Sequence, residues 1–483
     1  MATEHFDVLI VGAGLSGVGA ACHLQMKAKD RSFVILEARE RLGGTWDLFR
    51  YPGMRSDSDM YTLAYDFRPW REARAIVDGP SILRYLQDTA REFGVDRHVR
   101  LGWRVTRADW STAEALWRVE AQGPDGRLLQ FTCGFLYLCG GYYSYRGGHD
   151  PAIPGRERFG GRIVHPQDWP EDLDYAGRRI VVIGSGATAV TLVPALAETA
   201  AHVTMLQRSP SYVVPRPATD ARAAKLSPSQ GLAWRLVRWR HLLLQQWYYR
   251  VARHDPQAFK TRVADLARQQ LGPDHEARHF VPSYDPWDQR LCIAPDADLF
   301  RAIRTGQASV VTDVIETFTE TGIRLASGQE LAADIVVTAT GLELEVFGGV
   351  TLSVDGRPVE PGEALGYKGM MFEGVPNLAS AFGYTNASWT LKADLIADFV
   401  CRVLNRMRRT GLRQCTPRNR DPAMGRRPWI DFTSGYVQRA IHLLPQQGAR
   451  APWRAHQNYL KDLYALKLAP LNDGVLEFSN PAP

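Results

Sequence analysis

The chain has 483 residues, of which 45% are hydrophobic and 23% charged, as in an ordinary globular protein with more than one domain. Its net charge of +6 comes from 58 basic against 52 acidic residues, which is too small an excess to indicate a nucleic-acid-binding protein. No apolar run approaches the roughly 18 residues of a membrane span, and no signal peptide opens the sequence, so we expect a cytoplasmic protein. The six cysteines lack C-x-x-C or metal-ligand spacing, so we expect free thiols and no bound metal.

The first motif is a glycine-rich turn after a buried strand. The run HFDVLIV (5–11) is nearly continuous in apolar residues, as in a central parallel strand, and Gly12, Gly14 and Gly17 follow it as G-x-G-x-x-G. The glycines allow a tight turn, a close approach of pyrophosphate and close helix–strand packing, and the helix N-terminus favours phosphate. The next strand, SFVILE, ends in Glu37, where an acid accepts from ribose hydroxyls and repels a 2′-phosphate. This pattern predicts a Rossmann-like site for FAD or NAD.

The segment that follows is unusual for a simple dehydrogenase. Residues 43–63, GGTWDLFRYPGMRSDSDMYTL, are rich in Gly, Trp and Asp. Asp57 is open to two interpretations, because the run Ser-Asp-Ser-Asp that contains it also has the composition of a helix N-cap. Short alternating strands between residues 100 and 139 then predict a β-meander.

A second glycine-rich motif differs from the first in its charge. Gly184, Gly186 and Ala189 form G-x-G-x-x-A, and the next strand, HVTMLQR, ends in Gln207 and Arg208 instead of an acid. An arginine here can form charge-assisted hydrogen bonds with a 2′-phosphate. The chain therefore has an acidic residue suited to the ribose of FAD and a basic residue suited to the 2′-phosphate of NADPH. Two dinucleotides imply that hydride passes from one to the other.

These motifs predict an α/β protein with two Rossmann-like dinucleotide-binding domains. We expect residues 1–145 to begin the FAD-binding domain, 146–341 to form the NADP-binding domain, and 342–483 to complete the FAD-binding domain and form a tail. A helical, basic, Trp- and Tyr-rich insert at about 220–275 is either a membrane-surface or partner-binding helix, or an insertion whose aromatics pack inward and whose arginines stay solvated; we favour the second. In the tail, Trp453 belongs either to a loop that closes over NADPH or to an ordinary surface loop.

A third motif lies just before the second glycine-rich turn. The segment FGGRIVHPQDWP has the spacing F-x-G-x-x-x-H-x-x-x-W-P, formed by Phe159, Gly161, His165, Trp169 and Pro170. From the residues alone it is a rigid connector. The spacing resembles the fingerprint of the type I Baeyer–Villiger monooxygenases, flavoenzymes that insert one oxygen atom of O2 beside a carbonyl.

The resemblance extends over nearly the whole chain. Gly44, Trp46 and Asp57 match the second fingerprint of that family, G-G-x-W-x-x-x-x-Y-P-G-x-x-x-D. The order of the motifs is most similar to the ethionamide-activating branch. It implies a flavoprotein of the disulfide-reductase-like fold in which a helix within residues 377–404 points its N-terminus at the flavin, and we also assign Val105 to the FAD site.

What the resemblance implies for chemistry is an NADPH- and O2-dependent enzyme. Through a C4a-peroxyflavin it would convert small hydrophobic ketones to esters or lactones and oxidise sulfides or thioamides. Asp57 would lie beside the flavin, Arg290 in DPWDQRLC would stabilise the peroxide, and His165 would act in a conformational change. Gln289 departs from the lysine that many members have, which leaves Arg208 as the main basis for an NADPH preference.

Two alternatives remain open. A generic or N-hydroxylating flavin monooxygenase would share both nucleotide motifs, although the Trp-Pro ending and Asp57 argue against it. A non-catalytic flavin-bound sensor or interaction module could use the basic aromatic insert, and NADPH would not bleach its colour. A disulfide reductase is disfavoured, because no redox C-x-x-C follows the first motif.

Overall fold

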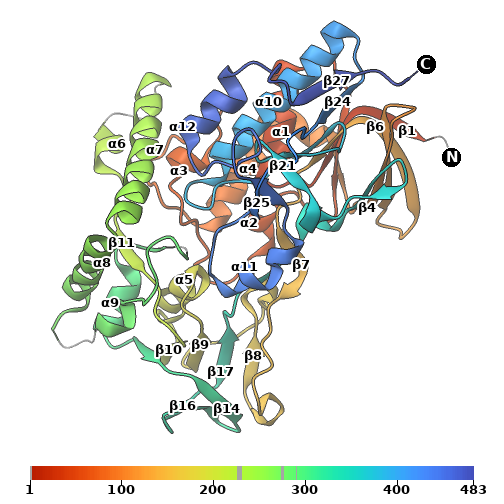
Figure 1. Cartoon of the computed structure of the whole chain (residues 1–483). Helices are drawn as coiled ribbons and strands as arrows, with labels where there is room; N and C mark the ends of the chain where they lie inside the picture. The colour runs from red at the N-terminus through yellow and green to blue at the C-terminus, as the bar shows by residue number, and fades with distance from the viewer. Residues whose placement is uncertain (1–2, 226–230, 274–276, 290, 483) are drawn as a thin grey trace.

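The chain folds around two separate sheets in a computed structural model that describes residues 3–225, 231–273, 277–289 and 291–482 (Figure 1). The larger sheet has nine strands and takes them from both ends of the chain, in the order β20-β19-β4-β5-β6-β1-β2-β3, with β23 paired to β6. Its strands are β1 (Glu4–Val11), β2 (Phe33–Glu37), β3 (Val99–Leu101), β4 (Arg104–Ser111), β5 (Leu116–Gln122), β6 (Leu128–Leu138), β19 (Thr351–Val354), β20 (Arg357–Pro358) and β23 (Leu378–Ser380).

Strand β1 lies at the centre of this sheet because its apolar end is covered on both faces. It runs parallel to β2 and β6, and Val8 to Val11 are buried. Helix α1 (Leu15–Lys27) packs along α10 (Trp389–Thr410), and α4 (Gly79–Glu92) covers α1. The antiparallel β4–β5–β6 ladder is the meander that the alternation predicts.

The second sheet is parallel throughout, in the order β13-β10-β9-β17-β8. Its strands are β8 (Arg162–Val164), β9 (Arg179–Ile183), β10 (His202–Gln207), β13 (Ala308–Thr312) and β17 (Ile335–Thr338), with α5 (Ala187–Leu196) and α9 (Asp298–Arg304) packed on them. A three-stranded antiparallel sheet of β14 (Ile315–Thr319), β15 (Gly322–Leu325) and β16 (Glu330–Ala332) lies beside it at the lower end of Figure 1.

The chain passes between the two sheets twice, and the two crossings pair with each other. Strands β7 (Tyr143–Gly148) and β18 (Leu342–Leu344) form a short antiparallel ladder. Just beyond it, the Thr340 hydroxyl donates to the carbonyl of His149 at 2.6 Å, and the His149 N–H donates to the carbonyl of Gly341 at 3.0 Å. The outgoing and returning chains are therefore one hydrogen-bonded unit.

The insert is helical, as predicted, and consists of α6 (Ala221–Lys225), α7 (Gly231–His254) and α8 (Pro256–Leu271) on the left of Figure 1. The expected packing is wrong in part. Trp247 and Tyr248 are exposed, whereas Arg238 is buried. The reason is that the Arg238 guanidinium donates to the carbonyls of Tyr61 at 2.9 Å and Ala64 at 2.8 Å, at the end of α3 (Met60–Leu63), where a short helix leaves carbonyls unpaired.

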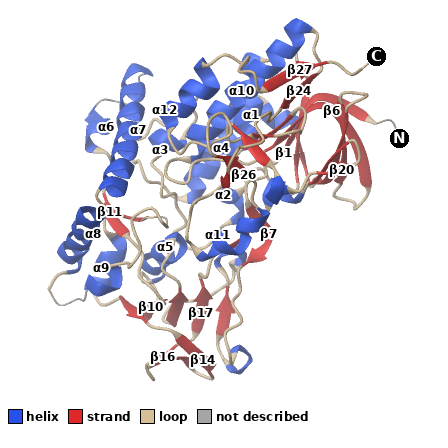
Figure 2. Cartoon of the chain, viewed as in Figure 1, coloured by secondary structure: helices blue, strands red, loops and turns tan. Residues whose placement is uncertain are grey.

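The C-terminal region packs on the larger sheet, as Figure 2 shows. It contains a four-stranded sheet of β21 (Leu365–Tyr367), β22 (Met371–Phe372), β25 (Arg426–Pro428) and β26 (Gln446–Gly448), the pair β24 (Gln414–Pro417) and β27 (Leu476–Ser479), and helices α11 (Gly435–Ala440) and α12 (Tyr459–Asp462). The side chain of Trp453 does not lie at the surface: its ring is buried against Tyr367, with centroids 5.8 Å apart. Within the described ranges, no helix combines the length and apolarity needed to cross a membrane.

Candidate active site

Two positions of the first glycine-rich turn have room for glycine alone. Gly12 has φ +99°, and a Cβ atom there would lie 2.8 Å from the carbonyl oxygen of Cys139; a Cβ at Gly17 would lie 1.8 Å from the carbonyl oxygen of Gly12. Gly14 faces Gly44, with 3.5 Å between its Cβ position and the Gly44 Cα. Gly14 is also the N-cap of α1 and provides no capping side chain, so the first N–H groups of the helix are left for an anion.

Glu37 is buried at the end of β2 and shapes this turn. Its Oε2 accepts the N–H of Ala13 at 2.7 Å and its Oε1 accepts the N–H of Arg39 at 2.9 Å. Burial raises the pKa of Glu37, and these two hydrogen bonds oppose the rise. Each carboxylate oxygen has a second lone pair, so Glu37 can still accept from a ribose hydroxyl.

The segment after β2 has a buried ion cluster that the sequence reasoning did not identify. Asp47 is buried, and Arg39, Arg41 and Arg50 approach it at 2.5, 3.3 and 3.4 Å. A buried carboxylate needs such partners, since an unpaired charge is costly. Trp46, beside it, is half-buried against the core of the first domain.

Residues 51–59 carry the first domain across to the second. Gly53 has φ +74°, and a Cβ there would lie 2.7 Å from the Cβ of Ala195 in α5. Arg55 pairs with Asp298 of α9 at 2.5 Å. These contacts hold the segment on the helices of the second sheet, and Arg55 is a second residue that the sequence reasoning missed.

Asp57 lies within this segment and is half-buried. Burial raises the pKa of Tyr51 to about 12; a hydrogen bond with Thr188 in the first turn of α5 opposes the rise, and the charge of Asp57 adds to it. Asp57 is thus in electrostatic reach of the start of α5. The N-cap of α3 is Asp59, whose carboxylate accepts the N–H of Thr62 at 3.1 Å, so the capping role belongs to Asp59 rather than Asp57.

The second glycine-rich turn repeats the geometry of the first. Gly184 has φ +136°, and a Cβ there would lie 2.4 Å from the carbonyl oxygen of Ala339. Gly186 is the N-cap of α5, again without a capping side chain, and no atom of the described residues lies within 4 Å of its Cβ position. Ala189 is buried in the core beneath. The turn therefore presents free N–H groups to open space, as a pyrophosphate site requires.

The two residues at the end of β10 differ in what they offer to a ligand. Gln207 is buried, and its Nε2 donates to the carbonyl of His279 and to the Thr312 hydroxyl, both at 2.8 Å. Arg208 is exposed and forms no ion pair with any residue that the structure describes. Arg208 is therefore the side chain free to bind a phosphate.

The predicted fingerprint residues are spread over the second domain. Phe159 packs on Phe318, with ring centroids 5.7 Å apart, and Trp169 packs on the core of the second sheet. A Cβ at Gly161 would lie 2.4 Å from the carbonyl oxygen of Asp334, and the carbonyl of Pro170 accepts the N–H of Leu173. The side chains of Phe159 and Trp169 therefore contribute to packing within the second domain.

His165 instead lies at the two crossings between the domains. Its Nδ1 accepts the N–H of Gln167 at 3.1 Å, which leaves Nε2 to donate to the carbonyl of Gly341 at 3.3 Å. A Cβ at Gly148 would lie 1.8 Å from the imidazole Cε1, so β7 fits only because residue 148 is glycine. Burial lowers the pKa of His165 despite the Gly341 hydrogen bond, which favours the neutral ring.

The N-terminus of α10 meets that of α1. The indole Nε1 of Trp389 donates to the Ser16 hydroxyl at 2.8 Å. Ser388, the N-cap of α10, makes no capping hydrogen bond and instead contacts the Thr62 hydroxyl at 2.7 Å. Two helix N-termini therefore converge beside the Gly- and Trp-rich segment.

Arg290, which the sequence places in the active site, lies outside the described residues. Beside it, Asp288 pairs with Arg253 of α7 at 2.6 Å and its carbonyl accepts the N–H of Thr433 at 2.9 Å. The side chain of Val105, on β4, is buried in the hydrophobic core, so a cofactor could meet only its main chain.

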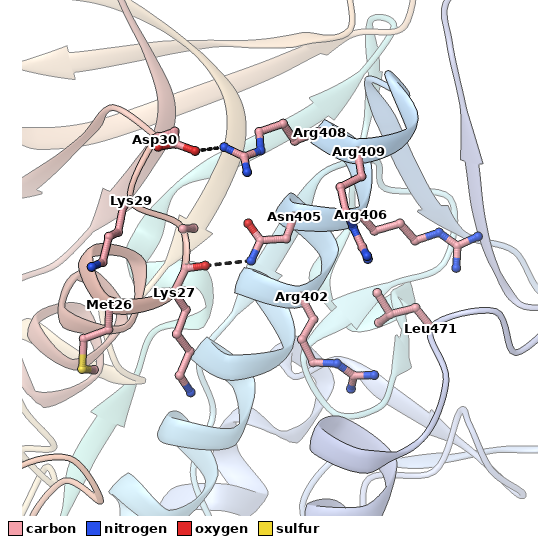
Figure 3. A pocket seen from close by; sticks show the side chains of 11 residues that line it. Met26, Lys27, Lys29, Asp30, Arg402, Asn405, Arg406, Arg408, Arg409 and Leu471 are labelled. Carbon is pink, nitrogen blue, oxygen red and sulfur yellow. Dashed lines mark hydrogen bonds and ion pairs between the residues drawn. The ribbon is translucent and has the colours of Figure 1, made fainter.

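A cavity of about 750 Å³ lies at the other ends of α1 and α10 and is strongly basic (Figure 3). It is lined by Met26, Lys27, Ala28, Lys29, Asp30, Arg402, Asn405, Arg406, Arg408, Arg409 and Leu471. Several of these groups have partners: Arg408 pairs with Asp30, and the Asn405 amide donates to the carbonyl of Lys27 at 2.7 Å. Cations complement the carbonyl ends of helices, where the dipole disfavours an anion, so we assign this cavity no ligand.

Two sheets, each with an uncapped glycine-rich helix start, define a protein of the two-dinucleotide flavoprotein class. The flavin-binding monooxygenase-like family model matches residues 5–347, and the chain belongs to this family. FAD-containing monooxygenase EthA of Mycobacterium tuberculosis is 53% identical over 100% of this chain and 99% of its own length, and EthA of Mycolicibacterium smegmatis is 50% identical over 99% and 98%.

Solved structures confirm the predicted fold. A steroid monooxygenase bound to NADP matches with a TM-score of 0.72 at 22% identity, covering 86% of this chain and 88% of that one. An open structure of cyclohexanone monooxygenase matches with a TM-score of 0.72 at 22% identity, covering 86% and 90%.

Proposed function

We propose that this chain is an FAD-containing, NADPH- and O2-dependent monooxygenase of the Baeyer–Villiger type. Its substrates would be small hydrophobic ketones, converted to esters or lactones, and sulfides or thioamides. One observation carries the proposal. The uncapped N-termini of α1 and α5 lie at two separate sheets, and residues 51–59 connect the two domains by packing on α5. Full-length relatives named as FAD-containing monooxygenases support it.

The first domain would hold FAD. The amides at Gly14 would bind the pyrophosphate, Glu37 a ribose hydroxyl, and Gly44 and Trp46 would adjoin the ring system. A bound flavin supplies the chemistry of hydride acceptance and oxygen activation. The positive end of the α10 dipole would stabilise negative charge near its N-terminus.

The second domain would hold NADPH. The amides at Gly186 would bind its pyrophosphate, and Arg208 its 2′-phosphate. His165 cannot easily act as an acid or base, because both ring nitrogens are engaged with main-chain groups. We infer a positioning role for it, in which it holds the two crossings between the domains together.

Oxygen transfer would depend on Asp57 and Arg290. A fixed guanidinium in a site that excludes water stabilises developing negative charge on oxygen, and a nearby carboxylate can hold it in place. We propose Arg290 for the first role and Asp57 for the second. The support for Arg290 is its place in DPWDQRLC, and the support for Asp57 is its position between the first domain and α5.

The test is a two-stage experiment on the purified holoprotein. Without oxygen, NADPH should bleach the flavin colour, and NADH should do so far more slowly. After air and a panel of ketones, sulfides and amines are added, ester or sulfoxide should form in proportion to the NADPH oxidised. Colour that NADPH does not bleach would indicate a sensor module, and product from amines alone would indicate an N-hydroxylating enzyme; either result refutes the proposal.

A further inference from the structure

Helix α7 buries polar as well as apolar side chains on its inner face and leaves large apolar side chains exposed on its outer face. On the inner face, Arg238 donates to the two carbonyls at the end of α3. His241, also buried, contacts Asp59 at 3.2 Å and Asp220 at 2.6 Å. These bonds fix the rotation of the helix about its axis.

The outer face carries a row of large apolar side chains, and the fixed rotation of the helix keeps them exposed. Side chains between 37% and 74% exposed lie along the helix, namely Leu232, Leu236, Trp239, Leu243, Leu244, Trp247, Tyr248 and Val251. The spacing 232, 236, 239, 243 and 247 places five of them on one stripe about 22 Å long. Soluble monomers rarely leave a continuous apolar patch of this kind without a partner.

The patch continues onto the C-terminal helix beside α7. The rings of Trp239 and Tyr459 are in edge contact at 6.0 Å, which joins α7 to α12. Beyond this contact, Leu460 in α12 and Tyr464 and Leu468 in the π-helical segment that follows it (Leu463–Leu468) are 40%, 64% and 66% exposed. Two neighbouring elements therefore present apolar side chains next to one another.

The positive charge of this region favours an anionic partner. The 24 residues of α7 include no Asp or Glu. Arg235 and Arg250 beside the stripe, and Lys461 and Lys467 beside the α12 side chains, are exposed and make no ion pair within the described residues. Two-fold pairing of α7 with a second copy would bring like charges together, whereas anionic lipid headgroups would neutralise them.

We propose that α7 and the adjoining α12 segment form a membrane-docking face that lies in the headgroup region of an anionic phospholipid surface. Leucines enter the apolar boundary, Trp239, Trp247 and Tyr248 occupy the interface that such rings favour, and the four cations meet the headgroups. The attachment is peripheral. It is independent of the monooxygenase reaction, because no residue of the face belongs to either dinucleotide site.

Co-sedimentation of the full-length holoprotein with vesicles tests this face. The protein should bind vesicles of phosphatidylglycerol and phosphatidylcholine, bind pure phosphatidylcholine much less, and be released by salt. Leu236→Gln and Leu243→Gln should each weaken binding on the order of tenfold, and Arg235→Gln and Arg250→Gln each about fivefold. The matched control is Leu128→Gln on β6, where a leucine 58% exposed lies on another surface, and it should bind normally.

Fluorescence gives a second reading that needs no disruptive variant. Brominated lipid chains should quench the emission of the unaltered protein, and the double change Trp239→Phe and Trp247→Phe should remove most of that quenching. No binding to anionic vesicles, equal loss in Leu128→Gln, or quenching that survives the double change would overturn the proposal. A dimer in sedimentation velocity that Leu243→Gln dissociates, without vesicle binding, would assign the face to a second copy instead.

Discussion

Replacing Arg208 by alanine should separate the two nicotinamide coenzymes. The guanidinium is exposed and unpaired within the described part of the chain, so its removal breaks no contact that stabilises the fold, and unfolding free energy should change by less than about 0.5 kcal/mol. A lost charge-assisted hydrogen bond to the 2′-phosphate costs about 1.5–3 kcal/mol. The Kd for NADPH should therefore rise roughly 10- to 150-fold, and the Kd for NADH should hardly change.

The assay is the rate of anaerobic flavin reduction as a function of coenzyme concentration. The half-saturating NADPH concentration should rise in Arg208→Ala while the limiting rate stays close to the parental value. Arg262→Ala on α8 is the control, since this arginine is also exposed and unpaired among the described residues. If Arg208→Ala weakens the binding of NADPH and NADH equally, or weakens the binding of neither, Arg208 does not bind the 2′-phosphate.

Three further changes test the rest of the site. Glu37→Arg should abolish FAD binding, because the Ala13 amide loses its acceptor, and full flavin absorbance in the purified variant would contradict this. His165→Gln should slow turnover but leave flavin reduction measurable. Burial lowers the folded-state pKa of His165 from 6.5, so the unfolded state takes up the proton first as the pH falls, and the stability that the neutral ring contributes is lost below about pH 6.5. The Tm of the glutamine variant should therefore fall less steeply in that range than the Tm of the parent protein. Arg290→Ala should still be reduced by NADPH but should release hydrogen peroxide in place of product, with oxygen transfer slower by about 10²–10³; an unchanged ratio of product to NADPH would exclude the role.

The parts of the site that the sequence predicts are those built from neighbouring residues. A buried strand, a glycine turn and a helix start are contiguous, so Gly12 and Gly184 could be assigned from their spacing, and their positive φ values follow from the turn itself. The opposite charges at the ends of β2 and β10 are readable in the same way. Each of these features depends on one short, continuous stretch of chain.

The parts that could not be predicted depend on groups far apart in the sequence. Arg55 and Asp298 are 243 positions apart, and only the fold brings them together. Arg238 is buried because α7 lies against carbonyls of α3, which no periodicity within α7 reveals. Trp453 is buried because it packs against Tyr367, which lies far from it in the sequence. The three arginines around Asp47 are local, and a carboxylate with three arginines within eight positions was the signal that could have identified them.

The number of places at which the two domains are attached limits how they can move. Two rigid bodies joined at two places can still rotate about the line between them, whereas a third attachment off that line removes this freedom. Here the ladder of β7 and β18, the segment around Arg55 and the inner face of α7 are attachments on different elements (Figure 1). A change in the angle between the domains therefore requires one attachment to open. The Arg55–Asp298 ion pair is one of these attachments, so its removal should make that motion easier.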